Sequence, residues 1–170
     1  DYAQAHLNHG HASLLLGDFV RGWPEYEWRR QLHRTAPCSF PQPRWDGTPL
    51  GGRTILLHAE QGLGDTVQFI RYAPLVKRQG GTVIATCQPP LTRLLATCSS
   101  IDMVIPEGAP LPSFDVHAPL LSLPDIFRTT LDSIPADVPY LRPPEGNRLP
   151  LDTIFPAQRD VLRVGIAWAG

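Results

Sequence analysis

Hydrophobic positions follow two different periods along the chain, and the change falls near residue 53. In the first 35 residues, apolar and small side chains recur at spacings of three and four, which is typical of amphipathic helices. The pair Gly17-Asp18 interrupts this series and is suited to end one helix and begin the next. The pattern predicts two antiparallel helices, whose facing positions are Leu7, Gly10, Leu14, Phe19, Trp23 and Tyr26.

From Arg53 onward, short apolar runs alternate with amphipathic stretches. The run 54–58 leads into a glycine turn and a helix that ends at Gly80-Gly81, and Pro89-Pro90 open a further helix. Such alternation is typical of βαβ units, so we expect an α/β fold with a parallel sheet covered by helices. The expected strands are 54–58, 82–86, 102–105, 115–118 and, after a long irregular stretch, 163–168.

A proline-rich stretch separates the two parts. Four prolines between 35 and 52, followed by Gly51-Gly52, exclude a regular helix there. We expect an extended linker over 36–52, with Phe40 and Trp45 holding it against the surface of the α/β domain.

Composition and charge narrow the classes of function. With 170 residues, 42% hydrophobic content and a net charge of -1, the chain is long enough for one domain and a small appendage. No basic cluster suggests a nucleic-acid partner, and no apolar run suggests a transmembrane segment or a leader, so we expect a cytoplasmic protein. Three cysteines without a CxxC pair indicate neither a disulfide framework nor a cysteine zinc site.

The histidines of the first predicted helix are candidate metal ligands by residue type only. His6, His9 and His11 lack the spacing of four that is usual for a helical metal pair, and no carboxylate or cysteine completes a set. We expect them to be solvated or to face another element, and we predict no metal site.

The run HAEQGLGDTVQFIRYAP, from His58 to Pro74, combines a strand end, a glycine turn and a helix start. Gly62 and Gly64 supply two glycines of a dinucleotide fingerprint, but Val67 occupies the third position and no acidic residue follows the strand 82–86. No lysine follows Gly64, which excludes a P-loop. We therefore predict no nicotinamide, flavin or other cofactor on this turn.

Polar residues of the turn have a structural and a functional interpretation. Asp65 can act as the N-cap of the following helix or as a catalytic base at the edge of the sheet. His58 is either a core histidine or a site residue. Glu60, beside a buried strand end, needs a partner, and Arg71 is the candidate that the sequence offers.

Several long stretches resemble a known combination of domains. Gly10, Gly22 and Tyr26 match the small and aromatic positions of one tetratricopeptide repeat. The segments 17–29, 40–76, 114–141 and 163–170 are similar, in the same order, to bacterial tetratricopeptide-repeat proteins fused to a family 9, heptosyltransferase-like glycosyltransferase module. In that family the Gly-Asp pair matched by Gly64-Asp65 carries the base that deprotonates the acceptor hydroxyl.

The resemblance implies a GT-B architecture of two Rossmann-like domains. It assigns 1–35 to a repeat-like hairpin, 53–144 to the acceptor-side domain, and 145–170 to the crossover and first strand of a C-terminal domain that binds the nucleotide sugar. It implies an inverting glycosyltransferase without an obligatory metal, with Asp65 as base and an acceptor-binding set made of Glu60, Gln61, Gly62, Gly64, Gln68 and Arg71.

Alternative functions and the identity of the ligands stay open at this point. The acceptor is a saccharide or a protein, and the repeats can bind a protein partner. A repeat-based binding module or scaffold with a degenerate GT-B sensor domain is the alternative to an enzyme. We expect the chain to be an N-terminal fragment of a longer protein, inactive alone because half of the cleft is absent.

Overall fold

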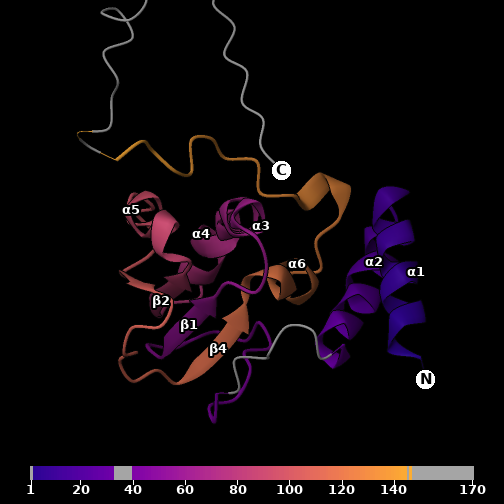
Figure 1. The fold of residues 1–170 in the computed structure, drawn as a ribbon, viewed down its shortest axis with the longest axis horizontal. Coiled ribbons are helices and arrows are strands. Elements are labelled where there is room, and N and C mark those ends of the chain that lie inside the picture. The colour runs from indigo at the N-terminus through magenta and orange to yellow at the C-terminus, as the bar shows by residue number, and fades with distance from the viewer. Residues whose placement is uncertain (1, 33–39, 145, 147–170) are drawn as a thin grey trace, which may run out of the picture.

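A helical hairpin and an α/β domain make up the protein in the computed structural model, which describes residues 2–32, 40–144 and 146 (Figure 1). The predicted strand 163–168 and Cys38 lie outside these residues. Within them, the longest helix has 13 residues, and no helix is long and apolar enough to cross a membrane.

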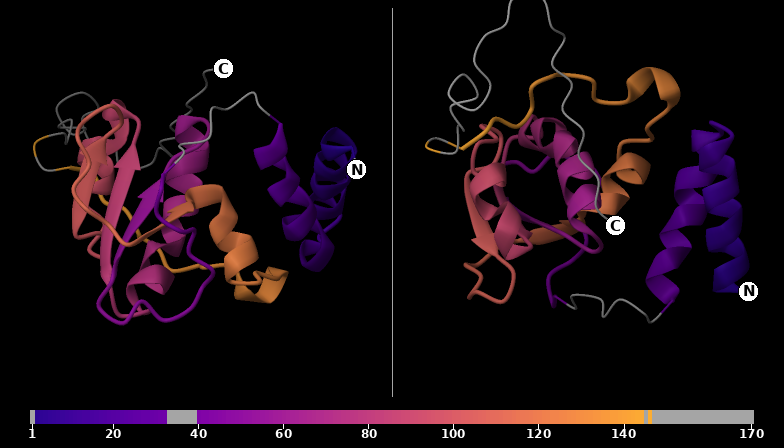
Figure 2. Two further views of the ribbon diagram at one scale, coloured as in Figure 1. Left: turned by 90° about the horizontal axis from the view of Figure 1, so that it is seen from below. Right: turned by 45° about the horizontal axis from the view of Figure 1, so that its top comes forward.

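The hairpin consists of α1 (Ala3–Leu15), α2 (Phe19–Tyr26) and a 3₁₀ helix, η1 (Glu27–Gln31), that continues α2. Asp18 caps α2, because its carboxylate accepts the Arg21 amide at 3.3 Å. The two helices predicted from the spacing are confirmed, and they pack against each other over most of their length (Figure 2).

The sheet contains four parallel strands in the order β3-β2-β1-β4. This arrangement confirms the predicted Rossmann-like α/β fold. The strands β3 and β4 each begin one residue later than expected, and the helix predicted after the glycine turn is divided by a 3₁₀ turn. The strands are β1 (Thr54–His58), β2 (Thr82–Cys87), β3 (Met103–Pro106) and β4 (Val116–Pro119).

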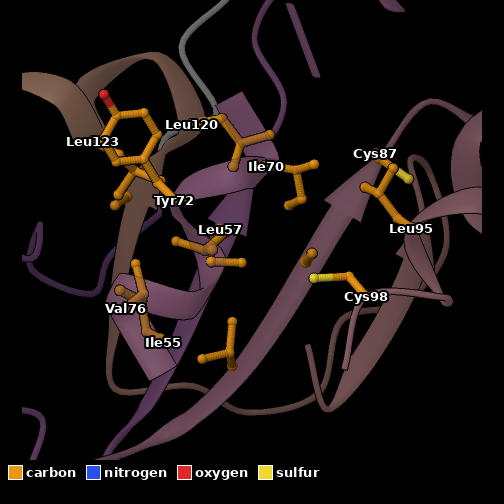
Figure 3. Packing of buried hydrophobic residues seen from close by; sticks show 14 of the residues in the cluster. Ile55, Leu57, Ile70, Tyr72, Val76, Cys87, Leu95, Cys98, Leu120 and Leu123 are labelled. Carbon is orange, nitrogen blue, oxygen red and sulfur yellow. The ribbon is translucent and has the colours of Figure 1, made fainter. Parts of the chain in front are cut away.

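Helices cover one face of the sheet (Figure 1). They are α3 (Leu63–Phe69), η2 (Ile70–Tyr72), α4 (Ala73–Lys77), η3 (Pro89–Leu91) and α5 (Thr92–Leu95). Alternate residues of β1, Ile55 and Leu57, point toward this layer and pack with Ile70 and Val76 in the main core (Figure 3). Both strand residues are fully buried, which is typical of a central parallel strand.

The opposite face of the sheet is covered by irregular chain. Leu56 and Ile84 lie in a second buried cluster, against which Phe40 and Phe114 pack. Phe40 comes from the proline-rich linker, so the linker does contact this domain.

The same linker also covers the free edge of β4. The Trp45 amide donates to the His117 carbonyl at 2.8 Å, and the His117 amide donates to the Pro43 carbonyl at 3.2 Å. Residue 44 thereby forms a parallel bridge with His117, and the Trp45 side chain is only 3% exposed.

Short helices follow β4, where the sequence predicted irregular chain. They are η4 (Leu120–Ser122), α6 (Leu123–Ile126) and η5 (Leu131–Ser133). Helix α6 lies between the sheet and the hairpin and contacts α2 (Figure 1). The end of β4 is therefore joined directly to the elements that touch the hairpin.

We expect Gly10→Ala to loosen the hairpin, because an added Cβ would lie 2.7 Å from the Tyr26 backbone nitrogen. Backbone atoms cannot rotate away, so the free energy of unfolding should fall by about 1–3 kcal/mol in urea denaturation. Gly64→Ala is the matched control, since Gly64 lies in α3 and a Cβ there would meet nothing within 4 Å. Equal stability of the two variants would contradict close packing at Gly10.

Candidate functional site

The glycine turn leaves the carboxyl end of β1 and enters α3. Gly62 is the N-cap of that helix, and Asp65 is the third residue after the cap. The predicted N-cap role of Asp65 is therefore wrong. The Asp65 carboxylate reaches back and accepts the Gly62 amide through Oδ2 at 3.0 Å. Within the described residues, its Oδ1 has no hydrogen-bond partner. Asp65 thus fixes the turn with one oxygen, and the other, which no described residue contacts by a hydrogen bond, can accept a proton or a hydrogen bond.

Gln88, at the end of β2, holds the turn from the side of the sheet. Its side-chain amide donates to the Gln61 carbonyl at 2.6 Å, and its carbonyl accepts the Thr66 hydroxyl at 2.9 Å. Thr66 is 1% exposed. A single glutamine therefore ties the start of the turn to the first turn of α3, a role that the sequence analysis did not assign.

Glu60 is paired with Arg29 of the hairpin rather than with Arg71. Arg29 Nη2 lies 2.8 Å from Glu60 Oε2, and the two side chains are 7% and 17% exposed. The expected Glu60–Arg71 pair was wrong because Arg71 points the other way. Its guanidinium contacts the Pro135 carbonyl and the Tyr140 hydroxyl, and stacks over the Tyr140 ring at 5.0 Å.

A network of buried and partly buried polar groups surrounds Arg29. The Arg29 guanidinium donates to Glu27 and, at 2.8 Å, to the Ser122 hydroxyl. Arg44 Nη2 lies 3.2 Å from both Glu27 and Ser122. Burial acts to lower the pKa of Arg29, but the carboxylates of Glu60 and Glu27 outweigh it and raise that pKa above its ordinary value. Two arginines thus face two glutamates.

This network occupies the point where the strand order reverses. Glu60 follows β1 and Ser122 follows β4, and the crevice between the carboxyl ends of these two strands is where open α/β sheets commonly bind ligands. Here Arg29 bonds to both residues and fills that position. Ligand atoms near Asp65 must therefore approach from another side of the turn.

Tyr26 makes a second contact between the hairpin and the turn. The Gln61 side-chain amide donates to the Tyr26 hydroxyl at 3.2 Å. The Arg29 guanidinium lies 4.7 Å from the centre of the Tyr26 ring. Burial is the main cause that raises the pKa of Tyr26. The hairpin therefore holds both Glu60 and Gln61.

The predicted site residues are only partly brought together. Glu60, Gln61, Gly62 and Asp65 lie in one turn. Gln68 is exposed, and its backbone carbonyl accepts from the Arg71 guanidinium at 2.9 Å. Gly64 is exposed in the first turn of α3. Tyr26, Arg29, Gln88 and Ser122 were missed. The signal that could have identified Arg29 is its spacing of three from Tyr26, which continues the inward face of the hairpin.

Two hollows lie near the site. A cavity of about 150 Å³ adjoins the carboxyl ends of β1, β2 and β3 and is lined by residues that include Ala59, Thr86 and Glu107. A groove of about 780 Å³ separates α2 from α6 and the linker, with Trp23 and Asp125 among its lining residues. Burial is the main cause that raises the pKa of Asp125.

His58 lies in the interior and points away from the turn. It is 4% exposed, and its Nε2 is 3.2 Å from His117 Nδ1. The Phe40 ring packs edge-on against both imidazoles. Burial, assisted by the charge of His117, lowers the pKa of His58 to about 3. His58 is thus a neutral core residue at neutral pH.

The three histidines of α1 face the rest of the hairpin. His6 lies 2.6 Å from Glu25 and stacks on Trp28, and His11 packs on the Tyr26 ring. His9 lies 3.7 Å from Glu25. Across the part of the chain that the structure describes, no three histidine, cysteine or acidic side chains are arranged to hold a metal ion.

Comparisons with known proteins give one partial match. A stretch of 63 residues, 36% of the chain, is 38% identical to protein FlbA of Caulobacter vibrioides, and the chain spans 11% of the length of that protein. No family model matches the chain. No solved structure matches it either.

We expect stability to fall below pH 6.5 because of His58. Its folded pKa of about 3 lies below the value of about 6.5 in the unfolded chain, so protons bind the unfolded state first. This histidine should remove about 2–3 kcal/mol between pH 7 and pH 4.5, a loss absent from His58→Gln in urea titrations. His11→Gln, at an exposed position, is the control. Parallel pH profiles for wild type and His58→Gln would contradict the assignment.

Proposed function

We propose that this chain is the acceptor-side part of an inverting glycosyltransferase, in which Asp65 is the catalytic base. The observation that carries the proposal is the geometry of its carboxylate. One oxygen is fixed by the Gly62 amide at 3.0 Å, and the other has no partner within the described residues. A carboxylate that is oriented but not saturated is suited to accept a proton from a bound hydroxyl.

The proposed reaction is a direct displacement at the anomeric carbon of a nucleotide sugar. The acceptor oxygen forms the new glycosidic bond as the bond to the diphosphate breaks, and the leaving diphosphate takes the electron pair. Asp65 takes the proton of the acceptor hydroxyl. Attack from the face opposite the leaving group inverts the configuration of the sugar.

The charge distribution supports an acceptor role for this domain rather than a nucleotide-binding role. Arg29 and Arg44, the arginines nearest the switch point, are already paired with glutamates or Ser122. The turn carries no lysine, and Asp65 and Glu60 make it acidic. A diphosphate would be poorly stabilised there, so we assign the donor nucleotide to a C-terminal domain beginning near Arg163, outside the described residues.

The acceptor is a saccharide or a protein, and the hairpin is proposed to be part of a repeat array that binds a protein partner. A cytoplasmic location agrees with the use of a nucleotide sugar. These assignments rest on the resemblance to the heptosyltransferase-like family, and the carboxylate geometry adds to it.

A binding module without transfer activity is the second candidate. It is favoured by the apolar side chains that the hairpin exposes, since Leu15, Leu16 and Val20 are 88%, 86% and 73% exposed. Such a surface is typical of a protein interface. In a pure binding module, Leu15→Asp would abolish partner binding, and no nucleotide sugar would be consumed by any variant.

We expect Asp65→Asn to lower kcat by about 10²–10⁴-fold in the longest natural form of the protein, because the amide cannot accept the proton. The measurement is transfer from UDP-, GDP- and ADP-sugars, followed by mass spectrometry. An asparagine side-chain oxygen can still accept the Gly62 amide, so the fold should be kept.

Asp132→Asn is the control, because Asp132 is an exposed aspartate in η5. Transfer that survives Asp65→Asn unchanged would reduce Asp65 to a structural role. Transfer by the 170-residue chain alone would contradict the need for a second domain.

A further inference from the structure

The hairpin and the α/β domain meet at the turn that carries the proposed base. Arg29 contacts Glu60, and Tyr26 contacts Gln61, so two consecutive side chains of the turn are held by residues from outside the domain. Gln88 holds the same turn from β2. Contacts from the hairpin and from Gln88 therefore hold the turn, and only the Gln88 contact comes from the α/β domain.

The hydrogen bonds of Arg29 are made by a buried side chain and have defined directions. Its side chain is 7% exposed and donates to Glu27 in η1, Glu60 in the glycine turn and Ser122 in η4. A guanidinium presents its donors in a rigid planar fork, so its position determines where each acceptor must lie. Water cannot readily replace these contacts at a buried site.

A short covalent and hydrogen-bonded path joins Glu60 to Asp65. Gly62 lies two residues after Glu60, and its amide is the hydrogen-bond donor to Asp65 Oδ2 at 3.0 Å. If Glu60 were released, the backbone at Gly62 would shift, and the Asp65 carboxylate would lose the contact that orients it. Among the described residues, Arg29 makes no hydrogen bond to Asp65.

We propose that Arg29 is a positioning residue of the site: from the helical hairpin, it fixes Glu60 and thereby sets the direction in which Asp65 presents its free oxygen. The role of Asp65 in this statement rests on the function proposed above. The positioning of the turn by the hairpin does not depend on that function, because it is a property of the fold that can be measured without a substrate.

Hydrogen exchange in the 170-residue chain and in its longest natural form tests the positioning. In Arg29→Met, the two hydrogen-bonded amides of the turn, those of Gly62 and Thr66, should exchange at least tenfold faster, whereas those of the central strand β2 should keep their wild-type rates. Arg21→Met is the matched control, since Arg21 lies on the same hairpin with a 77% exposed side chain. Unchanged exchange at Gly62 and Thr66, or equal acceleration in β2, would overturn the proposal.

A second set of variants tests whether the effect comes from loss of the Arg29–Glu60 ion pair or from a general loss of packing. Arg29→Met leaves two buried glutamates without their main partner, so Glu60→Gln serves as the milder variant. Glu60→Gln should accelerate exchange in the same turn, and the double variant should exceed neither single variant by more than twofold. Arg29→Lys, which keeps the charge but not the fork, should give intermediate rates. Additive effects of the two substitutions would overturn the assignment.

Kinetics then distinguish the two proposals. If the longest natural form transfers a sugar, Arg29→Met should lower kcat at least tenfold with an unchanged KM for the nucleotide sugar, and Arg21→Met should change neither. Faster exchange of the turn with an unchanged kcat would overturn the link to Asp65. If no transfer is found, the proposed function fails, while the exchange data still decide whether the hairpin positions the turn.

Discussion

A buried guanidinium determines how the two parts of this protein fit together. Removing a charge from water is unfavourable by several kcal/mol, and only close, well-directed partners offset that loss. Arg29 has such partners in Glu27, Glu60 and Ser122. Because the partners lie on the hairpin, after β1 and after β4, the charge is satisfied only when the hairpin is docked and the sheet is formed. Docking and folding are therefore coupled.

The main elements of the fold could be predicted from the sequence because their signals are local. A fully buried strand such as β1 is a continuous apolar run, and glycines mark the ends of the helix that follows. The one-residue shifts of β3 and β4 occur where polar Asp102 and Asp115 flank short apolar runs. Both carboxylates accept backbone amides, those of Val83 and Thr54, at 2.7 Å. Helix α6 was not predicted because it has only four residues and contains Pro124.

The candidate site was predictable only where it is contiguous in the chain. Gly62 and Asp65 are three residues apart, and their hydrogen bond follows from ordinary helix-start chemistry. The Arg29–Glu60 contact joins residues 31 positions apart, and the Arg29–Ser122 contact joins residues 93 positions apart. Periodicity carries no information on such pairs. A buried carboxylate can be expected to have a cationic partner, but the sequence does not say which arginine reaches it.

The linker that borders β4 determines which edge of the sheet is open to a further strand. Pro43 and Trp45 use the hydrogen-bonding groups of His117 on the outer edge of that strand, and prolines on either side of Gln42 offer no amide to a further strand. On this side of the sheet, the linker thus prevents pairing with a further strand. On the opposite side, β3 has four residues and presents a half-exposed Met103. Of the described edges, β3 is the one at which this sheet can be extended, by the same chain or by another.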